Sequence, residues 1–111
     1  MTALTVTTSD DEISINLQAV MDLIRAKDLR RAFLDSLRKI ESHDSSQSTI
    51  TIMAGDVTRI TTPCLQVLLA MKNKTTEQHI DFLIPEMSDA FQHALKEVGL
   101  EGQFINPEQN T

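Results

Sequence analysis

Residues 49–84 contain the stretch that decides the fold: TITIMAGDVTRITTPCLQVLLAMKNK at 49–74, then HIDFLI at 79–84. Thr49–Ile52 and His79–Ile84 are rich in β-branched and aromatic residues, which favour strands. Cys64 to about Lys74 is apolar on nearly every face and predicts a largely buried helix. The Thr-Pro step at 62–63 is typical of a helix start. This order predicts two parallel strands joined by a right-handed crossover.

Two further strands are expected before this unit. Residues 4–8 (LTVTT) and 13–17 (ISINL) each alternate apolar and polar side chains, as half-buried strands do, and the SDD sequence at 9–11 favours a turn between them. They predict an antiparallel hairpin. Residues 18–26 show no clear period. From about Asp28 the spacing becomes helical, with a buried stripe of four residues: Leu29, Phe33, Leu37 and Ile40. The polar stretch 41–48 is predicted to be a loop.

The last part of the chain predicts a third helix. Pro85 is expected to end the strand before it, and Ser88 is the expected N-cap. Gly99 is the expected left-handed terminator. The buried stripe of this helix is predicted at Phe91, Leu95 and Val98, and residues 103–105 suggest a short edge strand.

The predicted fold class is therefore α/β: a small mixed β-sheet of four to five strands flanked by three helices, in the order β-β-α-β-α-β-α with a final β as an option. Helices should cover one or both faces of the sheet. We expect one domain over residues 1–106 and a flexible tail over 107–111.

Composition excludes several function classes. The chain has 111 residues and a net charge of −6. It contains four Phe and no Trp or Tyr. Nucleic-acid binding and membrane adhesion both need clustered basic surface, so neither is expected. The charge is uneven, however: residues 22–41 hold six basic and four acidic side chains, and the other residues hold four and twelve. This predicts a mildly basic helix on an acidic body, either as a solvated face or as a docking strip.

No catalytic, metal or cofactor site is predicted. Motifs that cradle phosphate, activate a serine or bind zinc are absent from the sequence. The three histidines, His43, His79 and His93, are isolated. Cys64, the single cysteine, is interpreted as a small buried residue, with a reactive thiol as the alternative. Without a signal sequence or a long apolar run, the chain is expected to be cytoplasmic, with no direct membrane insertion.

The ordered motifs resemble the STAS family (sulphate transporter and anti-sigma factor antagonist) over about residues 3–105. Residues 50–69, ITIMAGDVTRITTPCLQVLL, resemble the family's strand, "DSSG" turn and helix. Upstream, Met21-Asp22 stands at the family's "GELD" position and LRRAFLDSL resembles its first helix. Downstream, HIDFLIPEMSDAFQHALKEVGLEGQF matches its last strand and helix. Met53, Thr61, Pro63 and Cys64 stand where the family pattern has Asp, Asp, Ser and Gly.

The resemblance implies a non-enzymatic module that docks on a regulatory protein, of the anti-sigma, kinase-like or chemotaxis and stress-signalling type. It places the phosphorylatable hydroxyl on Thr62, and the interpretations of Thr62 as a plain helix cap, as a phosphoacceptor or as both stay open. The partner-binding residues it implies are Asp22, Asp56, Thr58, Thr61, Thr62, Pro63 and Gln66. The alternative function is an accessory subunit of a lipid-trafficking ABC transporter ATPase. A homodimer through the strand that begins at Leu4 is a further option.

Overall fold

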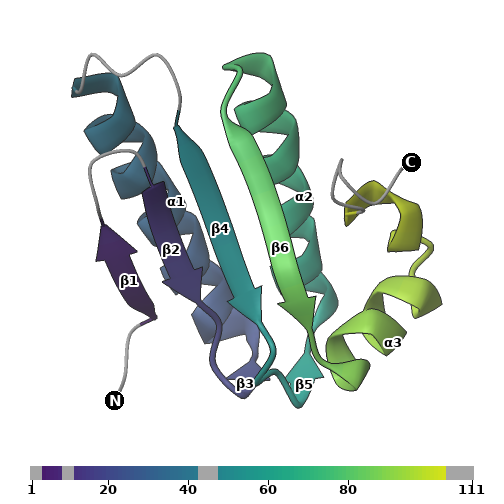
Figure 1. The fold of residues 1–111 in the computed structure, drawn as a ribbon. Helices are drawn as coiled ribbons and strands as arrows, with labels where there is room; N and C mark the ends of the chain where they lie inside the picture. Colours follow the sequence, from purple (N-terminus) through teal and green to yellow (C-terminus); the bar gives the residue numbers. More distant parts are fainter. Residues whose placement is uncertain (1–3, 9–11, 43–47, 105–111) are drawn as a thin grey trace.

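The computed structural model describes residues 4–8, 12–42 and 48–104. Its centre is a four-stranded mixed sheet in the order β1-β2-β4-β6 (Figure 1). The strands are β1 (Thr5–Thr8), β2 (Glu12–Asn16), β4 (Thr49–Ala54) and β6 (Asp81–Met87). β1 pairs antiparallel with β2, and β2, β4 and β6 run parallel. The predicted hairpin, the parallel β4–β6 pair and the α/β class are therefore confirmed. The turn expected at 9–11 lies outside the described residues.

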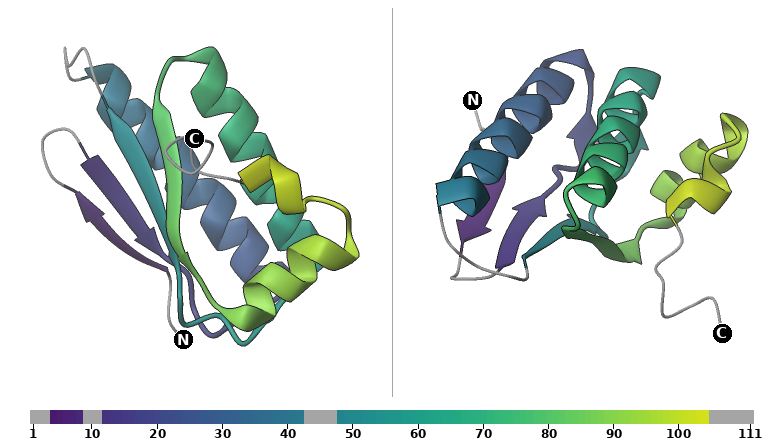
Figure 2. Two further views of the ribbon diagram at one scale, coloured as in Figure 1. Left: turned by 45° about the vertical axis from the view of Figure 1, so that its right-hand side comes forward. Right: turned by 90° about the horizontal axis from the view of Figure 1, so that it is seen from above.

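Three helices lie on one side of this sheet (Figures 1 and 2). They are α1 (Leu23–Ser42), α2 (Thr62–Glu77) and α3 (Asp89–Glu97). Alternation along the strands places Ile13 and Ile15 of β2 beside Ile50 and Ile52 of β4, and all four are buried. Because successive strand side chains point to opposite faces, Ser14 and Thr51 lie together on the face that these helices leave open.

The core between sheet and helices is built from the expected apolar stripes. It is extended by residues of the connecting segments, and its fully buried large side chains include Ile15, Met21, Leu29, Ile50, Ile52, Val57, Leu65, Leu68, Met71, Phe91 and Leu95.

A second, two-stranded sheet was not predicted. It pairs β3 (Val20–Met21) in parallel with β5 (Arg59–Ile60). The pairing extends on either side: the Thr58 and Arg59 amides both donate to the Ala19 carbonyl, at 2.8 and 3.1 Å. Each strand immediately precedes a helix, so this small sheet brings the starts of α1 and α2 together (Figure 1).

α1 begins earlier than expected, at Leu23 instead of about Asp28. Asp22 caps this helix, because its Oδ1 accepts a hydrogen bond from the Arg25 amide at 3.1 Å. Leu23 and Ile24 are more than half exposed, so the first turn does not follow the apolar stripe that signals a helix. The helix continues to Ser42, so the expected loop at 41–48 begins later than predicted; its residues 43–47 lie outside the described part of the chain.

β6 does not end at Pro85, as predicted, but continues to Met87. Two features explain this. β6 is an edge strand, so a residue without an amide hydrogen is tolerated there. The pairing with β4 also shifts between Thr51 and Met53, where β6 has one extra residue, and Pro85 lies in that irregular stretch.

The C-terminal expectations are partly correct. Ser88 is the N-cap of α3 and Gly99 has a φ of 76°, both as predicted. Val98, however, is 41% exposed, because α3 ends at Glu97 and leaves Val98 beyond the stripe. The predicted edge strand is wrong: Glu101–Phe104 form a 3-10 helix, and the Phe104 ring packs 6.5 Å from that of Phe82. Residue 105 and the tail at 107–111 lie outside the described residues.

Candidate functional site

The first turns of all three helices lie at the end of the sheet where β2, β4 and β6 terminate (Figure 1). We call this end the C-terminal edge. It carries the β3–β5 sheet and the residues that precede α1, α2 and α3. The amino end of a helix has a partial positive charge and attracts anionic groups. The C-terminal edge therefore combines exposed chain with the amino ends of three helices.

The structure places the seven partner-binding residues expected from the sequence in or beside this edge. Asp22 precedes α1; Asp56 and Thr58 lie in the connection between β4 and β5; Thr61, Thr62, Pro63 and Gln66 belong to the start of α2. Six of the seven are exposed, and Thr61 alone is partly buried.

Thr62 is the first residue of α2 and its side chain is exposed. Its interpretation as the helix cap is wrong, because the N-cap is Thr61, with φ −93° and ψ 160°. The helix therefore begins two residues earlier than the predicted Cys64. Within the described part of the chain, the Thr62 hydroxyl has no hydrogen-bond partner, so it is presented to solvent.

Thr61, one residue earlier, is held in place by β3. Its amide donates to the Met21 carbonyl at 3.0 Å, and its hydroxyl donates to the same oxygen at 3.1 Å. The hydroxyl makes no capping bond to α2. Thr61 thus connects the start of α2 to the β3 strand, and its neighbour Thr62 has no such connection.

Cys64 completes this connection from inside. Its side chain is fully buried, and the Sγ atom lies 3.3 Å from the Met21 carbonyl oxygen and 3.2 Å from that of Asp22. Burial raises the pKa of the Cys64 thiol, and the nearby Asp22 carboxylate raises it further, whereas hydrogen bonds from Thr61 lower it. The single proton of the thiol can be donated to either of these carbonyls. Cys64 is therefore a small buried residue, as predicted from the sequence, and it also forms a hydrogen bond.

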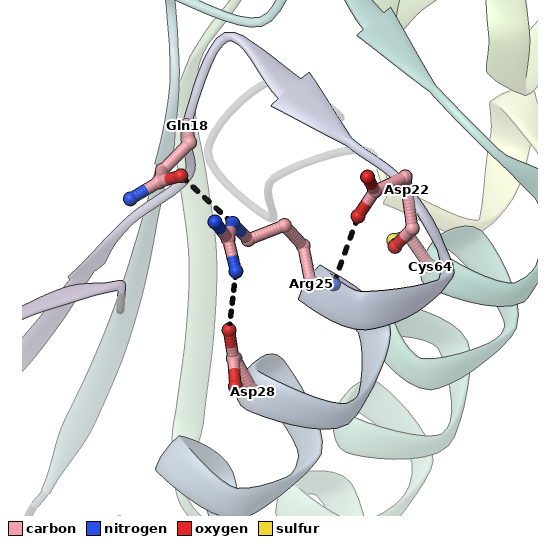
Figure 3. A network of polar contacts seen from close by, with 5 residues as sticks. All are labelled: Gln18, Asp22, Arg25, Asp28 and Cys64. Carbon is pink, nitrogen blue, oxygen red and sulfur yellow. Dashed lines mark hydrogen bonds and ion pairs between the residues drawn. The ribbon is translucent and has the colours of Figure 1, made fainter. Parts of the chain in front are cut away.

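Asp22 has a structural role at the same edge (Figure 3). Its carboxylate caps α1 through the Arg25 amide. The Arg25 side chain donates to Gln18 at 2.9 Å and to Asp28 at 2.8 Å, which ties the chain before β3 to the first turns of α1. The capping oxygen of Asp22 is thus engaged within the domain, although the residue is exposed.

Two further contacts of this edge escaped the sequence interpretation. The Thr58 hydroxyl donates to the Ala19 carbonyl at 3.0 Å, which strengthens the β3–β5 pairing. The Ser88 hydroxyl donates to the Val57 carbonyl and accepts from the Phe91 amide, so the cap of α3 also holds the β4–β5 connection. The capping signal of Ser88 was visible in the sequence, but its link to Val57 had no local signal.

The described residues contain no group of three or more His, Cys, Asp or Glu side chains arranged to hold a metal ion. None of the helices described has the length and apolar composition that crossing a membrane requires. The C-terminal edge presents an exposed hydroxyl at the start of α2, a carboxylate that caps α1, and small polar side chains on a backbone held by hydrogen bonds.

The family model described as "Mlab, STAS domain" matches residues 4–106. The chain belongs to the STAS domain family. The fold agrees with this: the structure of the anti-sigma factor antagonist SpoIIAA in its unphosphorylated form superposes with a TM-score of 0.71 and 11% sequence identity, over 96% of this chain and 91% of that one. A comparison with curated proteins gives no match. The expected family and fold class are thus confirmed for this STAS domain.

Proposed function

We propose that this STAS domain is a non-enzymatic docking module, similar in role to an anti-sigma factor antagonist. Its partner is a kinase-type or chemotaxis and stress-signalling regulator, which contacts the C-terminal edge. Phosphorylation of Thr62 weakens this docking. The observation that carries the proposal is the contrast between adjacent threonines: Thr61 is bound to Met21, whereas the Thr62 hydroxyl is exposed and free for another macromolecule to reach.

A phosphate on Thr62 would act on the partner and not on the fold of the domain. Pro63 has no amide hydrogen, and the Cys64 and Leu65 amides already donate to the Thr61 carbonyl, at 3.1 and 3.2 Å. Few backbone donors of the first turn remain to bind the phosphate, although the α2 dipole favours its charge. The group therefore faces outward and adds about −1.5 to −2 charges to the docking surface.

Such a charge change is large enough to control an interface. Like charges placed opposite each other across an interface cost several kcal/mol, and about 1.4 kcal/mol already changes an affinity tenfold. The surrounding residues Thr58, Pro63 and Gln66 are uncharged and exposed, so the phosphate would be the dominant new charge on this part of the surface.

The second candidate function is that of an accessory subunit on the ATPase of a lipid-trafficking ABC transporter. The exposed Thr hydroxyl at this turn is compatible with it, since STAS proteins of that group are expected to use a Thr there. The family's Asp and Gly in the same turn are replaced here by Thr61 and Cys64, which favours the first function. Genes adjacent to this one, encoding a signalling kinase or an ABC transporter, would distinguish the two.

The test begins with affinity purification of the native protein and identification of the bound partner. Its affinity is then measured by calorimetry for the parent chain, for Thr62→Glu and for the control Asn73→Glu. Asn73 is exposed on the same helix, 11 residues later and so about 16 Å away, beyond the screening distance at physiological salt. We expect Thr62→Glu to weaken binding by about tenfold or more and the control to have little effect. Equal affinities for a folded Thr62→Glu and the parent would refute the switch.

A further inference from the structure

An open groove of about 660 Å³ lies between α1 and α2, and its lining includes exposed residues of both helices. Figure 2 shows the two helices lying side by side over the sheet. The apolar part of the groove includes Leu23 and Leu34 from α1 with Pro63, Val67 and Ala70 from α2. Leu23 is 59% exposed and Leu34 is 43% exposed. A continuous apolar surface of this kind on a small domain is typical of an interaction site.

The charge of the groove is opposite to that of the chain. Its charged lining residues are Lys27, Arg30 and Lys74, and no carboxylate lines it. The chain as a whole has a net charge of −6. None of these three cations forms an ion pair with another described residue, whereas Arg25 and Arg38 of the same helix α1 pair with Asp28 and Asp35. The groove thus offers apolar surface bordered by cations that are available to a partner.

We propose that this groove binds an amphipathic helix of a partner protein whose polar face is acidic. Leu23 and Leu37, the first and last α1 residues that line the groove, are 14 residues apart, or about 21 Å along the axis. A helix of about 14 residues matches this length and places apolar anchors at i, i+3 or i+4, and i+7. Its acidic side chains then lie against Lys27, Arg30 and Lys74.

The position of the groove connects it to the switch, and in this respect the inference rests on the proposed function. Pro63 and Gln66 belong both to the first turns of α2 and to the lining of the groove. Thr62, directly before Pro63, therefore lies at the end of the groove. A negative charge on Thr62 repels the acidic helix that the groove attracts. The partner helix is therefore the group on which a phosphate at Thr62 acts.

The direct test uses two labelled peptides of about 16 residues with the same leucine positions at helical spacing. One carries glutamates on its polar face and the other carries lysines. Binding to the parent chain is measured by fluorescence anisotropy at low and at physiological salt. We expect the acidic peptide to bind at least about tenfold more tightly than the basic one, with a difference that shrinks as salt rises. Equal binding, or tighter binding of the basic peptide, overturns the proposal.

Two variants locate the binding. Leu34→Glu places a charge in the apolar lining, and its control Val98→Glu alters a side chain of similar exposure, 41%, beyond the end of α3. Arg30→Glu reverses one groove cation, and its control Lys96→Glu does the same on α3. Both groove variants are expected to lose about tenfold or more of the acidic-peptide affinity, and both controls are expected to keep it. Retained affinity in a folded Leu34→Glu contradicts the proposal.

The partner isolated by affinity purification separates this inference from the proposed function. If Thr62→Glu weakens that partner and Leu34→Glu does not, the switch stands and the groove proposal is wrong. If Leu34→Glu weakens it and Thr62→Glu does not, the groove stands and the switch is wrong. Sedimentation provides a third outcome: a dimer of this chain that Leu34→Glu abolishes would show that a second copy, and not an acidic helix, occupies the groove.

Discussion

Thr61 and Thr62 are adjacent and chemically identical, yet replacing each by valine should have very different effects on stability. Valine has nearly the shape of threonine without the hydroxyl, so the change isolates the hydrogen bond. Thr61→Val removes a bond of 3.1 Å from a partly buried hydroxyl to the Met21 carbonyl. That carbonyl keeps its 3.0 Å bond from the Thr61 amide and the contact with Cys64, so it is not left without a partner.

The loss should therefore equal the net worth of one hydrogen bond, about 1 kcal/mol, without an added penalty for an unsatisfied group. For a domain of this size that corresponds to a fall of about 4 °C in Tm. Thr62→Val changes an exposed hydroxyl without a described partner, so its effect should stay within about 0.5 kcal/mol.

Urea unfolding followed by circular dichroism measures both variants against the parent. We expect a lower midpoint for Thr61→Val with an unchanged slope, and a parental curve for Thr62→Val. A loss for Thr62→Val equal to or larger than that for Thr61→Val would refute the assignment of Thr61 as the N-cap that is bonded to β3. Such a result would indicate that Thr62, and not Thr61, caps α2.

Two further predictions concern the same edge. Ser88→Ala should lower the free energy of unfolding by about 1 to 2 kcal/mol in urea melts, because it removes both the α3 cap and the bond to Val57; a parental midpoint would contradict this. For Cys64, whose pKa is raised above its ordinary value of 9.0 by burial, the folded state binds the thiol proton more tightly than the unfolded state. Its contribution to stability is complete below about pH 9 and is lost as the pH rises toward the folded pKa, so the parent should lose stability above pH 9 more steeply than Cys64→Ala. Parallel pH profiles for the two proteins would contradict this.

The sequence predicted the type of each principal element because its signals are local. Alternation at Ile13 and Ile15 indicates a strand, and the stripe at Leu29, Phe33 and Leu37 indicates a helix, whatever the rest of the chain does. The Ser88 cap and the Gly99 terminator are equally local, since each acts on the backbone within one turn.

Errors occurred where local rules compete with packing. Pro85 predicts a strand end, but an edge strand with an irregular pairing accommodates it. The sequence at 103–105 suggests a strand, but Glu101–Phe104 form a 3-10 helix. This helix places the Phe104 ring against that of Phe82. The first turn of α1 was missed because Leu23 and Ile24 face away from the core, so their pattern does not follow the apolar stripe.

From the sequence alone came the α/β class, the family resemblance and the short list of residues around Thr62, since periodicity and motifs are properties of neighbouring residues. The tertiary structure decided which threonine is held and which is free. That distinction depends on a hydrogen bond between Thr61 and Met21, which lie 40 positions apart and are brought together by the pairing of β3 with β5. It also decided that α1 and α2 lie side by side with the groove between them, because contacts between distant segments depend on how the helices pack on the sheet.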